Sequence, residues 1–315
     1  MQVFYSYLLL TLFICVNLEG QTSERFINKI FKSYEIDITQ DVVYGSNVNI
    51  AGDTVLLKFD FYAPNTNLDT LDERPLIIWA HGGSFIARDE NHWKIESLAK
   101  SFARKGYACA SISYRMLEIT DLSKENYLDE VVKAVGDMKS AIRYFRKDAA
   151  TKSMYKIDPS QIFVGGSSAG GLMALHTAYM TDTTGFRNYE KNFISMVKKN
   201  GGFEGNSGNE GYVSSVNGVI NLSGAIGDTN FIQCDEVPLI SVHETRDFIV
   251  PYKDGKAYGL ASLQGSFLIH DRMLKMGNES HLLTFKTINH TGYFYFKKRK
   301  TIEDFITHHL ANCLK

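Results

Sequence analysis

Residues 162–172, "IFVGGSSAGGL", decide how the rest of this chain is interpreted. An apolar run ends in seven small residues, and a helix-like run follows. A serine in such a turn lies at the carboxyl end of a strand and at the first turn of a helix. The turn is so tight that the residues two positions before and after the serine must be small. Ser168, between Gly166 and Gly170, fits this G-x-S-x-G pattern.

Two alternatives remain open at this turn. Ser167 has Gly165 and Ala169 at the corresponding positions, but glycine on both sides relieves more crowding than glycine with alanine. A glycine-rich turn can also merely pack closely or bind phosphate at the helix N-terminus. No GxxxxGK[ST] pattern supports phosphate binding. We therefore favour Ser168 as a nucleophile, which requires partners elsewhere in the chain.

Strand-like and helix-like segments alternate on both sides of this turn. A hairpin is expected first, and a mostly parallel sheet with helices on both faces should follow through right-handed crossovers, the α/β class. Ligands of such sheets bind at the carboxyl ends of the strands. The expected hairpin covers 34–45 and 53–64, the strands 75–83, 107–115, 161–166, 216–224, 237–244 and 281–288, and the helices 93–106, 126–149, 168–180, 256–277 and 301–315.

The segment "AHGGSF", residues 80–85, follows one of these apolar strands. Two adjacent glycines let backbone N–H groups turn toward a developing oxyanion. The N–H that follows the nucleophile, here that of Ala169, would be the matching donor. A loop that needs glycine only for its own turn would have the same sequence.

A candidate acid follows another apolar strand, in "SVHETRDFIVPY", residues 241–252. Asp247 lies a few residues beyond the end of that strand, where a carboxylate can orient an imidazole and stabilise its charge. Two other carboxylates are weaker candidates. Glu244 is still too close to the strand, and Asp228 follows an earlier strand.

The candidate base is His290, in "TINHTGY", residues 287–293. It lies in a loop after the last strand and completes the order nucleophile, acid, base that α/β-hydrolases use. Other histidines of the chain lie inside predicted helices or strands, at the start of a strand or in the glycine loop; these are His81, His176, His243, His281, His308 and His309.

With these motifs in this order, the chain resembles secreted α/β-hydrolases of the carboxylesterase/lipase superfamily, especially the bacterial feruloyl-esterase-like group. The resemblance covers residues 35–312, and "HGGSF", "GGSSAGG" and "HETRDFIVP" carry it. It implies an esterase without a metal or organic cofactor, with the backbone N–H groups of Gly83, Ser84 and Ala169 as oxyanion donors. Ser84 replaces a glycine found in many members, and Glu244 stands where the acid loop usually has glycine.

The expected reaction is hydrolysis of a carboxylic ester. Ser168 attacks the carbonyl, His290 takes its proton, and Asp247 orients the imidazole. The substrate is a small-molecule or polysaccharide-linked ester. An amidase or peptidase of the same fold remains an alternative, and a noncatalytic binding protein is a weaker one. The net charge of −1 favours neither nucleic acid nor an anionic membrane as a partner.

The first twenty residues have the pattern of an export signal. "YSYLLLTLFICVNLEG" is apolar, too short to span a bilayer comfortably, and ends in small and polar residues. We predict a signal peptide at 1–20, a single catalytic domain at 21–315 and a secreted or periplasmic enzyme with no membrane attachment after cleavage. No Lys or Arg precedes the apolar run, so an uncleaved N-terminal anchor is the alternative.

Two further expectations concern the periphery of the domain. Cys109 is expected in the core, whereas Cys234 and Cys313 both fall at the end of the sheet opposite the serine and could form a disulfide in an exported protein. Two unrelated thiols are the alternative. Residues 181–215 are longer and richer in Gly and Asn than an ordinary connection. They form either a cap that shapes the substrate pocket or a surface loop.

Overall fold

The computed structural model describes residues 24–86, 92–117, 122–186, 191–257, 259–290, 292–294 and 296–314. The signal peptide predicted for residues 1–20 lies outside these ranges. None of the helices within them combines the length and apolar character that crossing a bilayer requires.

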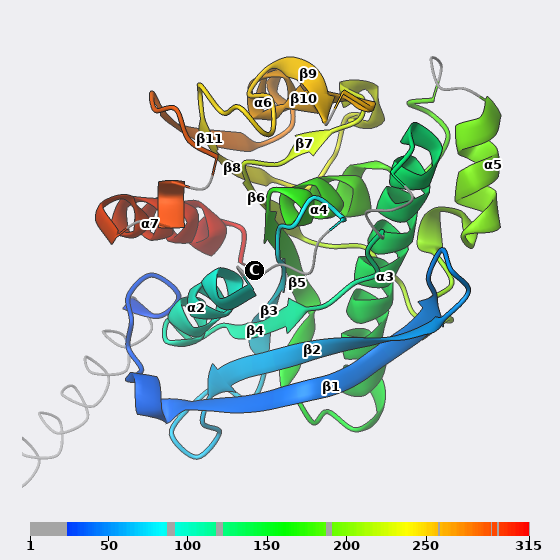
Figure 1. The fold of residues 1–315 in the computed structure, drawn as a ribbon. Coiled ribbons are helices and arrows are strands. Elements are labelled where there is room, and N and C mark those ends of the chain that lie inside the picture. Colours follow the sequence, from blue (N-terminus) through cyan, green and yellow to red (C-terminus); the bar gives the residue numbers. More distant parts are fainter. Residues whose placement is uncertain are drawn as a thin grey trace, which may run out of the picture.

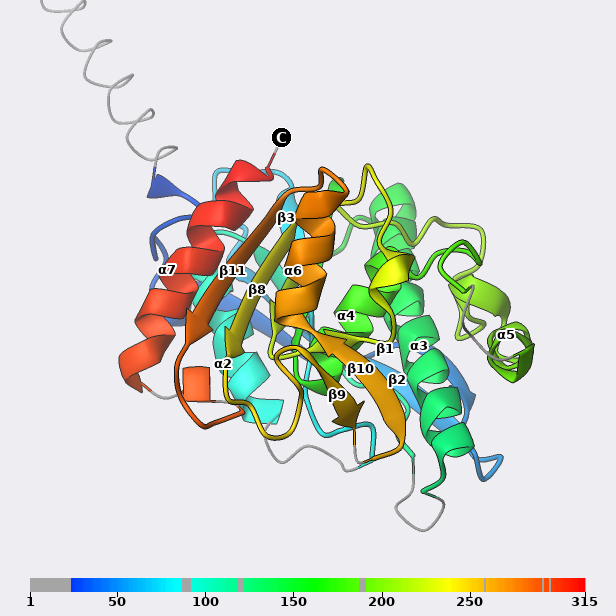
Figure 2. The same cartoon turned by 90° about the horizontal axis from the view of Figure 1, so that it is seen from above.

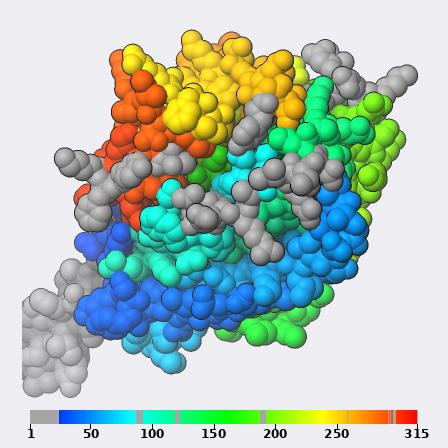
Figure 3. Space-filling model, viewed as in Figure 1, coloured from blue at the N-terminus to red at the C-terminus, as the bar shows by residue number. Residues whose placement is uncertain are grey.

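One eight-stranded sheet forms the centre of the molecule, in the order β1-β2-β4-β3-β5-β6-β8-β11. β1 and β2 form an antiparallel hairpin that joins β4, and the remaining strand pairs are parallel. In Figure 3 this hairpin is the blue band along one edge of the molecule. The strands are β1 (Ile36–Val48), β2 (Thr54–Pro64), β3 (Arg74–Ala80), β4 (Ala108–Ile112), β5 (Ile157–Ser167), β6 (Gly218–Leu222), β8 (Leu239–Glu244) and β11 (Ser280–Phe285).

Helices cover both faces of this sheet, as predicted. α3, α4 and α6 contribute to one hydrophobic cluster, and α2 and α7 to the other. Figure 2 shows β8 and β11 between α7 and α6. The helices are α2 (His92–Ala103), α3 (Lys124–Thr151), α4 (Ala169–Tyr179), α5 (Lys191–Lys199), α6 (Ser266–Lys275) and α7 (Phe296–Asn312), with short 3₁₀ turns η1 (Ser33–Glu35), η3 (Gly202–Glu204), η4 (Thr229–Phe231) and η5 (Gly292–Phe294).

The central strand β3 shows why its sequence is apolar without alternation. Leu76 and Ile78 pack into the cluster that contains α3 and α4, whereas Ile77 and Trp79 pack into the one that contains α2. All four side chains are fully buried. Each contributes about 1.5–3 kcal/mol of hydrophobic stabilisation. A strand covered on both faces has no polar face, because every residue points into protein.

The helix predicted for residues 256–277 is wrong in its first half. β9 (Asp254–Ala257) and β10 (Ala261–Gly265) precede α6 and form a small antiparallel sheet with β7 (Ala225–Ile226). In β10, burial alternates along the chain: Ala261 and Leu263 are buried, and Ser262 between them is exposed. This period of two outweighs the helix propensity of alanine and leucine.

The described residues of the segment 181–215 pack onto the domain and contribute Phe186, Phe193 and Val197 to its core. Its helix α5 packs near α3 (Figure 1), and Phe193 on α5 stacks on Phe186 with ring centroids 5.5 Å apart. Residues 187–190 lie outside the described residues. Whether the segment acts as a cap stays a prediction.

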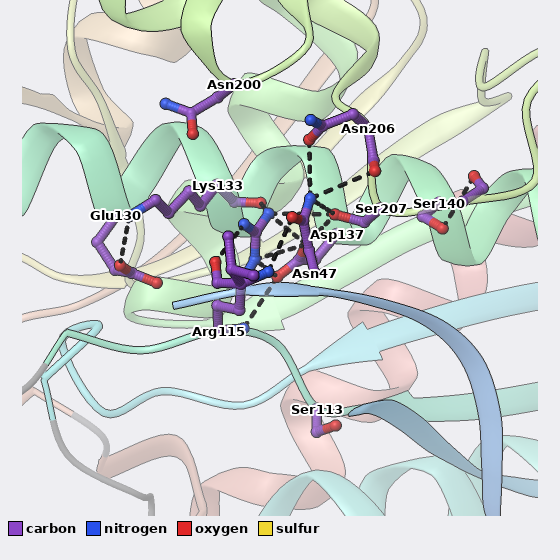
Figure 4. A network of polar contacts seen from close by, with 12 residues as sticks. Asn47, Ser113, Arg115, Glu130, Lys133, Asp137, Ser140, Asn200, Asn206 and Ser207 are labelled. Carbon is purple, nitrogen blue, oxygen red and sulfur yellow. Dashed lines mark hydrogen bonds and ion pairs between the residues drawn. The ribbon is translucent and has the colours of Figure 1, made fainter. Parts of the chain in front are cut away.

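A buried polar network holds the second half of that segment in place (Figure 4). Arg115 donates to both carboxylate oxygens of Asp137, at 2.7 to 3.1 Å, and Ser207 donates to the same carboxylate. Asn47 on β1 donates to the side-chain oxygen of Asn206 at 2.8 Å. The network thus ties the segment to α3 and the hairpin. Removing one partner would leave a buried charge without compensation, which is strongly destabilising.

The predicted disulfide is absent from this structure, where all three described cysteines are free. Cys313 packs against the cluster that contains α2 and α7. Cys234 follows Ile232, which is buried in the cluster on the other face. Cys234 itself is exposed and Cys313 is half-buried. Cys109 is buried in the core, as expected.

His176, on α4, is buried and held as the neutral ring. Its Nδ1 donates to the Leu172 carbonyl at 2.8 Å, and its Nε2 accepts from the backbone N–H of Gly227 at 3.1 Å. Burial lowers the pKa of His176 from 6.5 to about 4. Between these two pH values the unfolded chain binds a proton that the folded chain does not. His176 therefore does not reduce the free energy of unfolding above pH 6.5, and it reduces this free energy progressively as the pH falls toward 4.

We expect His176→Gln, which does not titrate, to remove this pH dependence. As the pH falls from 6.5 to 4, the unaltered protein should lose about 3 kcal/mol of unfolding free energy relative to the variant. Urea unfolding at several pH values measures this difference. His308→Gln, at an exposed position on α7, is the matched control and should run parallel to the unaltered protein. A difference between His176→Gln and the unaltered protein that stays constant with pH would contradict the assignment.

Candidate active site

Ser168 lies at the corner between β5 and α4 in a strained backbone conformation. Its φ is 56° and its ψ −115°, a region that residues with a side chain rarely adopt. A Cβ on Gly166 would overlap the carbonyl group of Gly170, and one on Gly170 would overlap the carbonyl oxygen of Ala80. Only glycine therefore fits on either side of this corner. The corner raises the Ser168 side chain above the carboxyl end of the sheet.

The structure brings Ser168, His290 and Asp247 into one line of hydrogen bonds. Ser168 Oγ lies 2.7 Å from His290 Nε2, and His290 Nδ1 lies 2.7 Å from Asp247 Oδ2. The three residues follow β5, β11 and β8, whose carboxyl ends lie at the same edge of the sheet. Residues far apart in sequence meet there because these strands are parallel.

The Asp247 carboxylate is fully buried yet ionised. Burial alone would raise its pKa, but hydrogen bonds donated by His243 and His290 outweigh this effect and lower the pKa of Asp247 to about 2. The backbone N–H groups of Ile249 and Val250 donate to Oδ1 at 2.9 and 3.0 Å. An ionised carboxylate only accepts, so Nδ1 of His290 carries the proton. In the neutral ring Nε2 is then free to accept from the Ser168 hydroxyl.

His243, on β8, contacts the Asp247 carboxylate. Its position inside a strand had not indicated any role at the site. Its Nε2 donates toward Asp247 Oδ2 at 3.3 Å and the Val250 carbonyl at 3.2 Å. Its Nδ1 accepts from Ser266 Oγ at 2.8 Å, and Ser266 in turn accepts from the Asn221 amide at 2.9 Å. This buried chain fixes the tautomer of His243. The only feature of the sequence that could have indicated this contact is the spacing of four residues between His243 and Asp247.

The glycine loop after β3 has three consecutive residues with positive φ, Gly83 at 116°, Ser84 at 60° and Phe85 at 63°. Residues with a side chain rarely adopt this conformation, so the loop is locally strained. Ser84 and Ala169 line the same small cavity as Ser168, whereas Gly83 is not part of its wall. Phe85 is fully buried and anchors the loop.

Tyr114, just beyond β4, holds the start of this loop and was not singled out from the sequence. Its hydroxyl donates to the carbonyl oxygens of His81 and Gly82 at 2.9 and 3.1 Å. Its ring stacks on that of His81 with centroids 4.5 Å apart. These contacts fix the backbone at the start of the glycine loop.

The alternative candidates lie elsewhere. Ser167 is the last residue of β5, paired with Leu222 of β6. Glu244 is buried and bound to Lys298 Nζ at 3.0 Å, so its charge is compensated. Asp228 caps η4 by accepting from the backbone of Asn230. No group of three or more His, Cys, Asp and Glu side chains within the described ranges is arranged to hold a metal ion.

Comparison with known proteins adds a family and a fold. Residues 59–226 match the BD-FAE family, a span that includes the glycine loop and Ser168. The quorum-quenching protein AidA of Acinetobacter baumannii (strain MDR-ZJ06) is 32% identical over 117 residues, 37% of this chain. That match spans 34% of AidA, about a third of its length.

Solved structures of esterase 2 from Thermogutta terrifontis resemble most of the chain. The apo form matches with a TM-score of 0.64 and 21% identity, over 90% of this chain and 96% of that one. The propionate-bound form matches with a TM-score of 0.63 and 19% identity, over 90% and 96% of the two chains. At these identities the likeness shows the fold, which is that of the α/β-hydrolases.

Proposed function

The chain belongs to the BD-FAE family, and we propose that it is a serine carboxylesterase whose nucleophile, base and acid are Ser168, His290 and Asp247. The observation that carries this proposal is the continuous line of hydrogen bonds from the buried Asp247 carboxylate through His290 to Ser168. The ionised acid fixes the tautomer in which Nε2 accepts the serine proton. That is the arrangement a neutral hydroxyl needs to become a nucleophile.

Acylation proceeds in two proton transfers. Ser168 Oγ bonds to the ester carbonyl carbon while His290 Nε2 takes the hydroxyl proton. The carbonyl oxygen becomes an oxyanion, which backbone N–H groups of the glycine loop and Ala169 stabilise. The bond to the alcohol oxygen then breaks, and that oxygen takes the proton from His290. The products are a free alcohol and an ester of Ser168.

Deacylation repeats these steps with water. His290 takes a proton from a water molecule as its oxygen attacks the acyl carbon, and returns the proton to Ser168 Oγ when the acyl–serine bond breaks. The acid is released and the enzyme is restored. In both half-reactions the imidazolium forms beside the Asp247 carboxylate, whose charge stabilises it. These steps involve neither metal nor organic cofactor.

An amidase of the same fold would use the same residues, so the substrate decides between the two. We expect purified enzyme to hydrolyse p-nitrophenyl esters faster than the matched p-nitroanilides. We also expect a fluorophosphonate probe to label the folded protein on Ser168 and to leave the heat-denatured protein unlabelled. Faster cleavage of the anilides than of the esters would show that the protein is an amidase rather than an esterase. Absence of labelling would indicate a noncatalytic protein.

The proposal extends to the enzyme's location and natural substrates. The leader-like composition of residues 1–20 supports a secreted or periplasmic enzyme. The sequence motifs shared with the feruloyl-esterase-like group support small-molecule or polysaccharide-linked esters as substrates. Fractionation of cells that produce the full chain, followed by N-terminal sequencing of the mature protein, tests the first point. A mature chain that retains residue 1 would contradict it.

A further inference from the structure

The side chain of Glu244 reaches the loop that carries the proposed base. Glu244 is the last residue of β8, is fully buried and pairs with Phe285 of β11. Thr287 Oγ1 donates to Glu244 Oε1 at 3.2 Å. A Cβ on Gly292 would overlap the same oxygen, so the backbone of Gly292 lies directly against it. Thr287 precedes His290 and Gly292 follows it, so one carboxylate oxygen contacts the chain on both sides of the base.

Lys298, in the first turn of α7, completes this contact. Its Nζ donates to Glu244 Oε1 at 3.0 Å and to Thr287 Oγ1 at 2.9 Å. The ring centroid of Phe285 lies 4.8 Å from the same nitrogen, a favourable place for a cation. Lys298 compensates the charge of Glu244, whose burial would otherwise be costly. The three polar side chains thus join β8, the loop after β11 and α7, which lie next to one another in Figure 2.

The backbone of Glu244 makes a corresponding contact with the acid. Its carbonyl oxygen accepts from the N–H of Asp247 at 3.1 Å, in the turn that follows β8. In the base loop, the N–H of His290 donates to Asn289 Oδ1 at 2.8 Å, and Gly292 packs closely against the Asn289 amide. Glu244 therefore contacts the acid turn through its backbone and the base loop through its side chain.

We propose that Glu244 is a positioning residue for the reaction: its side chain holds the loop in which the His290 imidazole meets both the acid and the nucleophile. The inference rests on the proposed esterase function and adds a residue that acts through the base. The imidazole makes hydrogen bonds of 2.7 Å to each of its two partners. A shift of the loop by about 1 Å would lengthen one of these bonds and lower the rate by about 100-fold. A glycine at position 244 would have no side chain to reach the loop.

Glu244→Ala removes the side chain and releases the base loop. We expect kcat for a p-nitrophenyl ester to fall by about tenfold to 100-fold, while KM changes by less than about threefold. The reason is that the lost contact acts on the transition state and not on substrate binding. The rate at which a fluorophosphonate probe labels Ser168 should fall by a similar factor, since this reaction also needs the base. A loss of stability alone would change neither rate in folded protein.

Two variants test the hydrogen bonds themselves. The side-chain carbonyl oxygen in Glu244→Gln can accept from the same two donors, so kcat should stay within about threefold of that of the unaltered enzyme. Thr287→Val leaves the buried pair of Glu244 and Lys298 intact, so it remains informative if Glu244→Ala does not fold. It should lower kcat by about threefold to tenfold. Added to Glu244→Ala it should lower kcat little further, because both changes break the same link.

Glu303→Ala is the matched control for the loss of a buried ion pair. Glu303, on α7, is also buried; it pairs with Arg299 at 2.7 Å and Lys29 at 3.0 Å and accepts from Ser101 at 2.7 Å. These contacts involve neither the nucleophile nor the acid or the base. The control should lower the melting temperature and leave kcat within about threefold of that of the unaltered enzyme. Thermal unfolding of each variant shows whether it is folded.

The outcomes distinguish the inference from the function on which it rests. If the unaltered protein hydrolyses none of the p-nitrophenyl esters, the proposed function fails and the inference fails with it. If it hydrolyses them and folded Glu244→Ala keeps kcat within about threefold, only the inference is overturned. The same holds if folded Glu244→Gln or Glu303→Ala loses as much activity as Glu244→Ala. If Glu244→Ala does not fold, an unchanged kcat in Thr287→Val overturns the inference.

Discussion

Ser168→Ala lowers kcat for ester hydrolysis by a factor of about 10⁴ to 10⁶. The hydroxyl is the one group at the strained corner that can form the acyl-enzyme, and alanine leaves His290 without a proton to accept. The side chain is small and nearly buried, so the substitution should leave the fold intact. The measurement is the initial rate on a p-nitrophenyl ester, with circular dichroism to show that the variant is folded.

Ser167→Ala is the matched control, because it makes the same change one residue earlier. Ser167 lies within β5, and its backbone pairs with Leu222 rather than forming the corner. We expect this variant to keep activity within about tenfold of the unaltered enzyme, as for a residue outside the chemistry. An active Ser168→Ala beside an inactive Ser167→Ala would move the nucleophile to Ser167.

His290→Ala should lower kcat as much as the loss of the nucleophile does, by a factor of about 10⁴ to 10⁶. Without the imidazole, Ser168 Oγ loses the acceptor that lies 2.7 Å away and takes its proton. Because the serine and the histidine act as a unit, the double variant with Ser168→Ala should lose little more than either single variant. Rates on the same ester for the two single variants and the double variant test this. If the loss of kcat in the double variant equalled the product of the losses in the two single variants, the two residues would not act in a shared step.

His281→Ala supplies the control for the base. His281 opens β11 at the end of the strand opposite His290, stacks on His309 with ring centroids 3.6 Å apart, and contacts Glu279 at 2.9 Å. Its removal should leave ester hydrolysis within about threefold of the unaltered enzyme. If His281→Ala were inactive and His290→Ala active, the base would have to be reassigned.

The sequence predicted the parallel sheet and the meeting of its motifs for one physical reason. Parallel strands end at a common edge, so a serine, an aspartate and a histidine that each follow such a strand must come close together. The spacing of glycines around Ser168 added the local register, because only a corner of this kind needs small residues at both positions. Neither argument required knowledge of side-chain contacts.

What the sequence could not predict depends on contacts between distant segments. β10 contains helix-forming residues, and only the burial of Ala261 and Leu263 on one side makes it a strand. The disulfide argument followed the direction of each strand and helix, but whether two thiols come close depends on the tertiary packing around them, and Cys234 and Cys313 are free in the structure. The support of Asp247 by His243 depends on a side-chain network that local patterns do not encode.

At position 168, the residue that would make the fold most stable differs from the residue that the proposed reaction needs. A φ of 56° suits glycine, which has no Cβ to crowd the corner. The residue that best fits the backbone here is therefore one that cannot attack an ester. Selection for stability alone would favour glycine at this position, whereas selection for the proposed reaction would keep the serine. A descendant released from that selection should lose the serine before it loses the two glycines, because the fold itself still requires them.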